Sequence, residues 1–244
     1  MQEERIKEFF EGVRKLLKEY ELDKRSLDNF FPNLRFRLDI FQQTKKQTDV
    51  YLASDFNVFD YIDPDENQLS DVIADLFNPK GKHGQGDVFL KEFLKVVGEF
   101  GNYDTHKANL NREELTTYII KSQRRIDITI DFGDSGIGIE NKPWAGEQED
   151  QIKDYKKHLE KKYKGKDKYL LIYLSHDGSS PTSIEQDVRE YLEKEGKLRT
   201  ISYPFEFKNW LESCYKECGA EKVRWFLRDF IEYVERNFRM QNVE

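Results

Sequence analysis

The chain has 244 residues, of which 36% are charged and 37% hydrophobic, and its net charge is −7. This length is enough for a sizeable core, either as one domain with extensions or as two small ones. No apolar run is long enough to span a bilayer, and the charged N-terminus is unlike a secretory signal, so we expect a cytoplasmic protein with no membrane contact. The acidic balance weighs against indiscriminate coating of DNA, although a local basic patch can still bind phosphate.

The N-terminal residues predict a helical extension. Between residues 5 and 20, apolar side chains recur at intervals of three and four, which predicts an amphipathic helix whose ordinary role is packing. Pro32, after two phenylalanines, then predicts a break in the chain. The aromatic residues between 36 and 56 have no clean period, so this part is either a helical arm or a hairpin.

Two further helices are predicted between residues 61 and 97, joined by a glycine-punctuated loop. Asp63 or Asp65 is placed to begin the first of them, with Pro64 in a favourable early position. The polar stretch over residues 98–113 predicts a loop.

The clearest strand pattern follows a first predicted strand at residues 115–121. Ile126, Ile128 and Ile130 alternate with polar residues, which is the period of a half-buried strand with the three isoleucines on one face. Glycines at the ends of residues 133–136 then predict a turn, and a second alternating run follows.

An antiparallel hairpin closed at this turn gathers charged side chains on one face. We expect Ile130 opposite Ile139 and Asp127 opposite Lys142, with Glu140 on the same face, because diagonal neighbours across two strands lie about 7–8 Å apart. Two carboxylates and an amine are costly together on a sheet unless a cation lies between the carboxylates. The alternative is a surface hairpin in which Glu140 and Lys142 form a solvated pair.

This arrangement resembles the PD-(D/E)XK nuclease superfamily. Asp127 is followed by the hairpin, by Glu140-Asn141-Lys142, and by a predicted helix with a Q-x-x-x-Y pattern that begins at Gln151. The D-x(12)-E-x-K spacing is unspecific by itself, because carboxylates and lysines are common. The alternating strands and the following helix make the match, and the bacterial branch with an I-E-N-K third strand is the most similar.

The resemblance implies an α/β fold: a three-layer restriction-endonuclease-like core, with a central mixed β-sheet flanked by helices. We expect a single nuclease-like domain over residues 1–244. Its parts are an N-terminal helical extension (1–60), the core (61–203) and extra C-terminal helices (204–244). Within the core, an apolar run and a short segment before a proline predict a central strand and an edge strand, at residues 169–174 and 201–203.

The resemblance also implies a divalent metal site. Asp127 and Glu140 are the expected ligands of Mg²⁺ or Mn²⁺, since carboxylate oxygens suit these ions. Glu66, in the first turn of a core helix, and the Asn141 backbone carbonyl are the further ligands that the resemblance implies. The alternative for Glu66 is favourable interaction with the helix dipole.

Two more catalytic residues follow from the resemblance. Lys142 would orient the attacking water or stabilise the transition-state charge. Gln151 would position either the substrate backbone or the lysine, and Tyr155 would support the site from the next turn of the helix.

We therefore expect a metal-dependent phosphodiesterase that acts on nucleic acid, on DNA in preference to RNA. A prokaryotic defence role and a homodimer are family analogies, and no dimer signature is visible in the sequence. The candidates for phosphate contact are Arg124, Arg125, Lys153 and Lys157. The alternative for the lysines is a solvated helix face. The alternative function is a catalytically silent nucleic-acid-binding or protein-interaction module on the same fold.

Overall fold

The computed structural model describes residues 2–99, 103–117, 124–144, 146–163 and 168–239; the side chains of residues 2–10, 17, 19 and 21–27 lie outside this description. The chain divides into two units, residues 1–56 and 57–244. Among the described residues, no helix is both long and apolar enough to cross a membrane. The predicted division of one domain at residues 60 and 203 stays a prediction.

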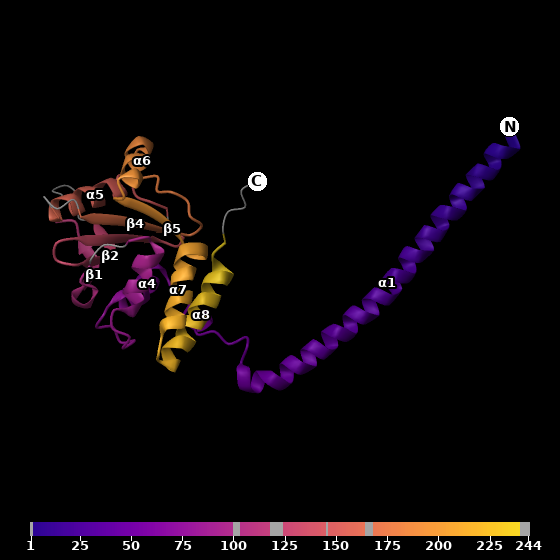
Figure 1. Cartoon of the computed structure of the whole chain (residues 1–244), viewed down its shortest axis with the longest axis horizontal. Coiled ribbons are helices and arrows are strands. Elements are labelled where there is room, and N and C mark those ends of the chain that lie inside the picture. Colours follow the sequence, from indigo (N-terminus) through magenta and orange to yellow (C-terminus); the bar gives the residue numbers. More distant parts are fainter. Residues whose placement is uncertain (1, 100–102, 118–123, 145, 164–167, 240–244) are drawn as a thin grey trace. The chain divides into compact units, whose positions relative to one another are not determined.

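A single helix, α1 (Gln2–Leu52), fills most of the first unit (Figure 1). The predicted break at Pro32 is wrong, because the helix continues through the proline, although a proline removes one backbone hydrogen bond. The segment beyond it is thus a helical arm and not a hairpin. Large apolar side chains along the helix are exposed, among them Phe30, Phe36 and Phe41.

The second unit is built on a five-stranded sheet in the order β1-β2-β3-β4-β5. β2 pairs antiparallel with both β1 and β3, whereas β3, β4 and β5 run parallel, so the sheet is mixed as predicted. The strands are β1 (Asn109–Leu115), β2 (Arg125–Asp131), β3 (Gly136–Lys142), β4 (Tyr169–Ser175) and β5 (Leu198–Ser202).

β1 lies earlier in the chain than the sequence predicts. The loop predicted over residues 98–113 is wrong from Asn109 onward, where the strand begins; the described residues before it form no strand. Of the strand predicted over 115–121, residues 118–121 lie outside the described part. β1 is an edge strand in which every second residue, such as Asn111, is exposed. Edge strands of this kind carry polar and charged side chains, which is why the composition suggests a loop.

Helices cover both faces of the sheet and complete the predicted three layers, with α5 and α6 on one side and α4, α7 and α8 on the other (Figure 1). The larger core cluster includes residues of α3, α4, α7 and α8, and the smaller one includes residues of α5 and α6. Leu170 and Ile172 of β4 face the larger cluster and Leu171 faces the smaller, so β4 is the predicted central strand. The helical elements are α2 (Phe59–Ile62), α3 (Glu66–Phe77), α4 (Val88–Val96), η1 (Thr105–Lys107), α5 (Gln151–Lys162), α6 (Gln186–Lys194), η2 (Tyr203–Phe207), α7 (Lys208–Glu217) and α8 (Glu221–Asn237).

Glycines on β3 allow α5 to lie close to the sheet. A Cβ atom at Gly138 would come within 3.0 Å of Leu159 Cδ1, and one at Gly136 would overlap the Tyr163 ring. The absence of side chains at these two positions lets the C-terminal end of α5 pack closely on the first half of β3.

The register of the β2–β3 hairpin differs from the prediction by two residues. Ile130 pairs with Ile137, so the predicted pairing of Ile130 with Ile139 is wrong. The reason is the turn: the Phe132 backbone N–H donates to the Ser135 carbonyl at 2.9 Å, which places Phe132 in the turn and not in the strand.

Candidate active site

β2 and β3 separate at the point where the predicted site residues lie. The strand pairing ends at Ile128, and side chains then take over the hydrogen bonds. Asp127 Oδ2 accepts the Asn141 backbone N–H at 2.7 Å, and the Arg125 carbonyl accepts the Tyr155 hydroxyl at 2.6 Å. Because these backbone groups are satisfied without strand pairing, the two strands can diverge and leave room between them.

The corrected register sets the two carboxylates side by side. Continued by one residue, the pairing places Asp127 level with Glu140. The predicted pairing of Asp127 with Lys142 is therefore wrong. A shift of two residues leaves the predicted alternation of faces unchanged, so the expectation that the two carboxylates lie together does not depend on the register. The conclusion that they converge is therefore unaffected by the error in register.

The three isoleucines of β2 do not share a face as predicted. Ile128 and Ile130 belong to the larger core cluster, whereas Ile126 packs with α5 in the smaller one. Glu113, which lies between the β1 partners of Ile126 and Ile128, has a left-handed φ of 50°. Together with the divergence of β3, this shows a bend in the sheet at Asp127.

Lys142 lies between carboxylates. Its Nζ is 2.7 Å from Glu140 Oε1 and 2.9 Å from Glu66 Oε1. Burial by itself lowers the pKa of Lys142, but the charges of Glu140 and Asp127 and the hydrogen bonds to Glu140 and Glu66 outweigh it, so the pKa is raised. Lys142 therefore remains protonated at neutral pH.

Glu66 is positioned by the start of α3. Asp65 is the N-cap and makes a capping box with Gln68, which confirms one of the two predicted starting residues. Glu66 is thus the first residue of the helix, and its side chain reaches Lys142 across the divergent strand ends.

Glu140 is the most deeply buried acid of the group, at 1% exposure. Burial, and then the neighbouring charge of Asp127, raise the pKa of Glu140 to about 8. Burial likewise raises the pKa of Asp127. Within the described part of the chain, Glu140 Oε2 has no hydrogen-bond partner, although buried polar atoms are rarely left unpaired.

This donor set fits a divalent cation. A hard oxygen atom without a partner and two adjacent carboxylates are the groups that such an ion stabilises. Among the residues that the structure describes, no three His, Cys, Asp or Glu side chains are gathered in the way that holds a metal ion. The third acid nearby, Glu66, is paired with Lys142, which also contacts Glu140.

The Asn141 side chain ties three elements together. Its Nδ2 donates to Ser70 Oγ of α3 at 2.9 Å, and its Oδ1 accepts the Tyr203 hydroxyl of η2 at 2.7 Å. The side chain is fully buried. The predicted ligand role of Asn141 therefore concerns its backbone carbonyl alone, while the side chain holds β3 against α3 and η2.

Gln151 connects α5 to the carboxylates. Its Nε2 is 2.5 Å from Glu140 Oε1 and 3.0 Å from the Tyr155 hydroxyl. Gln151 is predicted to position either the substrate backbone or Lys142. In the structure it contacts Glu140, which in turn contacts Lys142. Tyr155 supports the site, since its hydroxyl bridges Gln151 and the Arg125 carbonyl.

A model of the PD-(D/E)XK nuclease superfamily matches residues 56–237. The chain belongs to this superfamily. The matched residues include the whole sheet and α2 to α8, which confirms the predicted family and fold class. Neither the curated proteins nor the solved structures give a significant match to the chain.

Three of the four basic side chains predicted to contact phosphate are held in ion pairs. The fourth, Lys157, is exposed on α5. The three pairs are Arg124–Asp154 at 3.0 Å, Arg125–Glu113 at 2.6 Å and Lys153–Glu185 at 2.8 Å.

Sequence reasoning missed two residues around the PD-(D/E)XK site. Arg112 donates to the Asp127 backbone carbonyl and pairs with Asp71 at 2.7 Å, but it lies on the strand mistaken for a loop. Tyr203, which fixes Asn141, is 62 residues away along the chain, and no local pattern identifies it.

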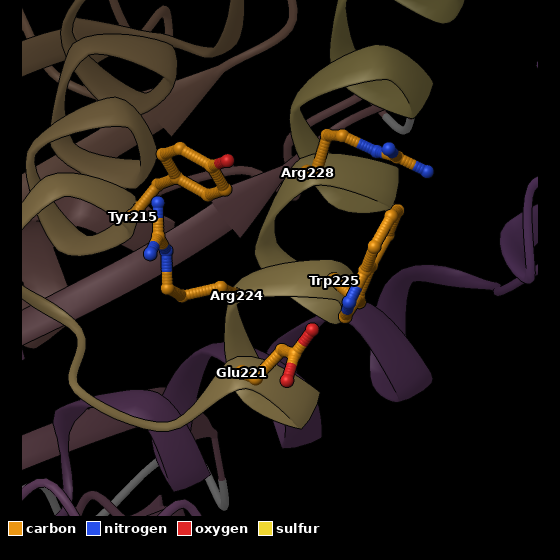
Figure 2. Close-up of a pocket in the computed structure, with 5 residues that line it drawn as sticks. All are labelled: Tyr215, Glu221, Arg224, Trp225 and Arg228. Atoms are coloured by element: carbon orange, nitrogen blue, oxygen red, sulfur yellow. The ribbon is translucent and has the colours of Figure 1, made fainter. Parts of the chain in front are cut away.

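A hollow of about 200 Å³ between α7 and α8 is separate from the site. Arg224 lies over the Tyr215 ring at 4.7 Å and Arg228 over the Trp225 ring at 4.1 Å. Figure 2 shows both pairs, with Glu221 below them. Because none of the PD-(D/E)XK site residues lines this hollow, we do not assign it to the site.

Proposed function

We propose that this protein is a metal-dependent phosphodiesterase that hydrolyses nucleic acid, DNA in preference to RNA. The observation that carries the proposal is the convergence of Asp127, Glu140 and Lys142 where β2 and β3 diverge, with one buried oxygen atom of Glu140 unpartnered in the described structure. Strongly perturbed acids gathered in this way are typical of functional sites. Membership of the nuclease superfamily supports the same reaction class.

Asp127 and Glu140 are the proposed ligands of Mg²⁺ or Mn²⁺, with Glu66 and the Asn141 carbonyl as further candidates. Such an ion, when bound, polarises the phosphate and lowers the pKa of its water. The preference for oxygen ligands follows from the hardness of both ions.

Lys142 supplies positive charge to the reaction. Because its pKa is raised, it donates hydrogen bonds and does not act as a general base. We assign to it the orientation of the attacking water or the stabilisation of charge on the phosphate oxygens. Glu66 and Glu140 hold the ammonium group in place, and Gln151 fixes the orientation of Glu140.

Arg124, Arg125, Lys153 and Lys157 remain the proposed phosphate contacts. The ion pairs of Arg125 and Lys153 are partly exposed, and such surface pairs contribute only about 0–1 kcal/mol. Exchanging their carboxylate partners for phosphate groups therefore costs little.

The proposal is tested by incubating supercoiled, linear and single-stranded DNA, and RNA of matched sequence, with Mg²⁺ or Mn²⁺ or with EDTA. The variants are Asp127→Asn and, as a matched control, Asp131→Asn at the other end of the same strand. We expect metal-dependent cleavage by the wild type and by Asp131→Asn, and none by Asp127→Asn. Calorimetry of metal binding shows whether a protein that does not cleave still has the metal site. No cleavage of any substrate, together with no bound metal, contradicts the proposal and favours the silent binding module.

A further inference from the structure

A second hollow opens directly beside Lys142. β3 and β4 are parallel and end level with each other, because Lys142 pairs with Ser175. Crevices outside the carboxyl ends of parallel strands are common ligand sites. Here the hollow measures about 390 Å³, and its lining includes Lys142, Trp144, His176 and Asp177.

Aromatic rings form one wall of this hollow. Trp144 is 51% exposed, and its ring stacks on Phe238 with 5.9 Å between centroids and 27° between planes. His176 lies 5.0 Å from the same phenylalanine, and its Nδ1 is fixed by a hydrogen bond to the Pro143 carbonyl at 2.7 Å. Phe238 is buried beneath both rings. Trp144 therefore presents an aromatic face that is supported from behind.

We propose that this hollow receives one unpaired nucleotide next to the scissile phosphate, with its base stacked on Trp144. The preferred substrate is then a single strand, or a duplex that is frayed or flapped at the cut. This inference rests on the proposed nuclease function, since it places the phosphate at Lys142. In an intact duplex the faces of the bases are covered by their neighbours, so only a base that has left the stack can lie on Trp144.

The charges of the hollow orient the nucleotide. Lys142 supplies positive charge and Asp177 supplies negative charge. The Asp177 carboxylate is held by hydrogen bonds from the Ser179 backbone N–H at 2.9 Å and from the Ser179 hydroxyl at 2.5 Å. A phosphate is attracted to the lysine and repelled by the aspartate. The uncharged base is thus the part of the nucleotide that suits the remainder of the hollow, and its amino groups can donate to Asp177.

The test measures binding by the full chain in EDTA, at constant ionic strength, by fluorescence anisotropy of a short labelled single strand and of the blunt duplex of the same sequence. The variants are Trp144→Ala, Trp144→Phe and the control Trp225→Ala, which removes an equally exposed tryptophan from the other hollow. Thermal unfolding checks that each variant is folded.

We expect Trp144→Ala to weaken single-strand binding by roughly 5- to 150-fold, the effect of losing one stacked base. Binding of the blunt duplex changes little, Trp144→Phe restores most of the affinity, and Trp225→Ala is unchanged. An equal loss on single strand and duplex, or no loss, overturns the inference. If cleavage still requires metal and Asp127, the proposed function survives that result. If the wild type neither binds nor cuts any nucleic acid, the stacking site and the proposed nuclease function are both wrong.

Discussion

At the scale of single residues, Gln151 decides how Glu140 is presented. Replacing it by alanine removes the hydrogen bond to Glu140 and leaves the Tyr155 hydroxyl with one partner fewer. Losing a residue that orients a ligand reduces metal affinity or activity by about 10- to 100-fold. We therefore expect Gln151→Ala to slow cleavage by this factor while the protein stays folded.

The control for this prediction is Gln148→Ala, the same change at an exposed position three residues earlier. Cleavage rates at saturating metal and metal titrations by calorimetry are measured for both variants. Wild-type rate and metal affinity in Gln151→Ala would show that Glu140 does not depend on α5 for its orientation.

Among the secondary-structure elements, β1 is joined to α5 by Glu114. It accepts hydrogen bonds from His158 at 3.1 Å, Lys162 at 2.7 Å and Thr129 at 2.6 Å. Burial by itself raises the pKa of Glu114, but these hydrogen bonds outweigh it and lower the pKa to about 2. A carboxylate whose pKa is lower in the folded state stabilises the protein above its ordinary pKa of 4.5, and this stabilisation is lost as the pH falls toward 2.

We expect Glu114→Gln to lower the free energy of unfolding by about 1–3 kcal/mol at pH 7, and this difference from wild type to close between pH 4.5 and 2. Denaturant unfolding across this pH range measures it. The neighbouring Glu113→Gln is the control, since its pair with Arg125 is exposed and contributes little. A difference for Glu114→Gln that does not change with pH would contradict the assignment.

Local patterns were sufficient to identify the catalytic candidates but not their surroundings. Asp127, Glu140 and Lys142 lie on two adjacent strands, so alternation predicts that they lie together even with the wrong register. It does not predict the bend at Asp127 that turns Ile126 toward α5. Trp144 and His176 lie over the same phenylalanine because β3 and β4 pair in parallel with level ends, which depends on contacts between distant segments. β1 was missed because an exposed edge strand has the composition of a loop.

For the molecule as a whole, α1 carries an apolar stripe, of which Tyr20, Phe31 and Phe41 are exposed. Because α1 continues through Pro32, where the sequence predicts a break, the apolar residues on both sides of the proline form one stripe. Their spacing alternates between four and three residues with interruptions at Lys24 and Lys45, which is the heptad period of a coiled coil. The stripe comprises Ile6, Phe10, Val13, Leu17, Tyr20, Leu27, Phe31, Leu34, Leu38 and Phe41. A self-complementary stripe of this length predicts association with a second copy of the chain.

Light scattering of the full chain is therefore expected to give the mass of a dimer. Leu34→Glu combined with Leu38→Glu should shift it to a monomer, because charges in the seam oppose pairing. Asn33→Glu combined with Gln43→Glu adds the same charge outside the seam and should leave the dimer intact. A wild-type monomer at micromolar concentration would refute the prediction.

The proposed reaction depends on the positive charge of Lys142 between the carboxylates, and single-turnover cleavage by Lys142→Met measures this dependence. The matched control is Lys162→Met. Lys162 is also largely buried and paired with a carboxylate, but its partner is Glu114. We predict that Lys142→Met binds Mg²⁺ or Mn²⁺ yet cleaves at least about 100-fold more slowly than wild type, whereas Lys162→Met cleaves normally once folded. Cleavage by Lys142→Met at the wild-type rate would show that the reaction does not need this charge.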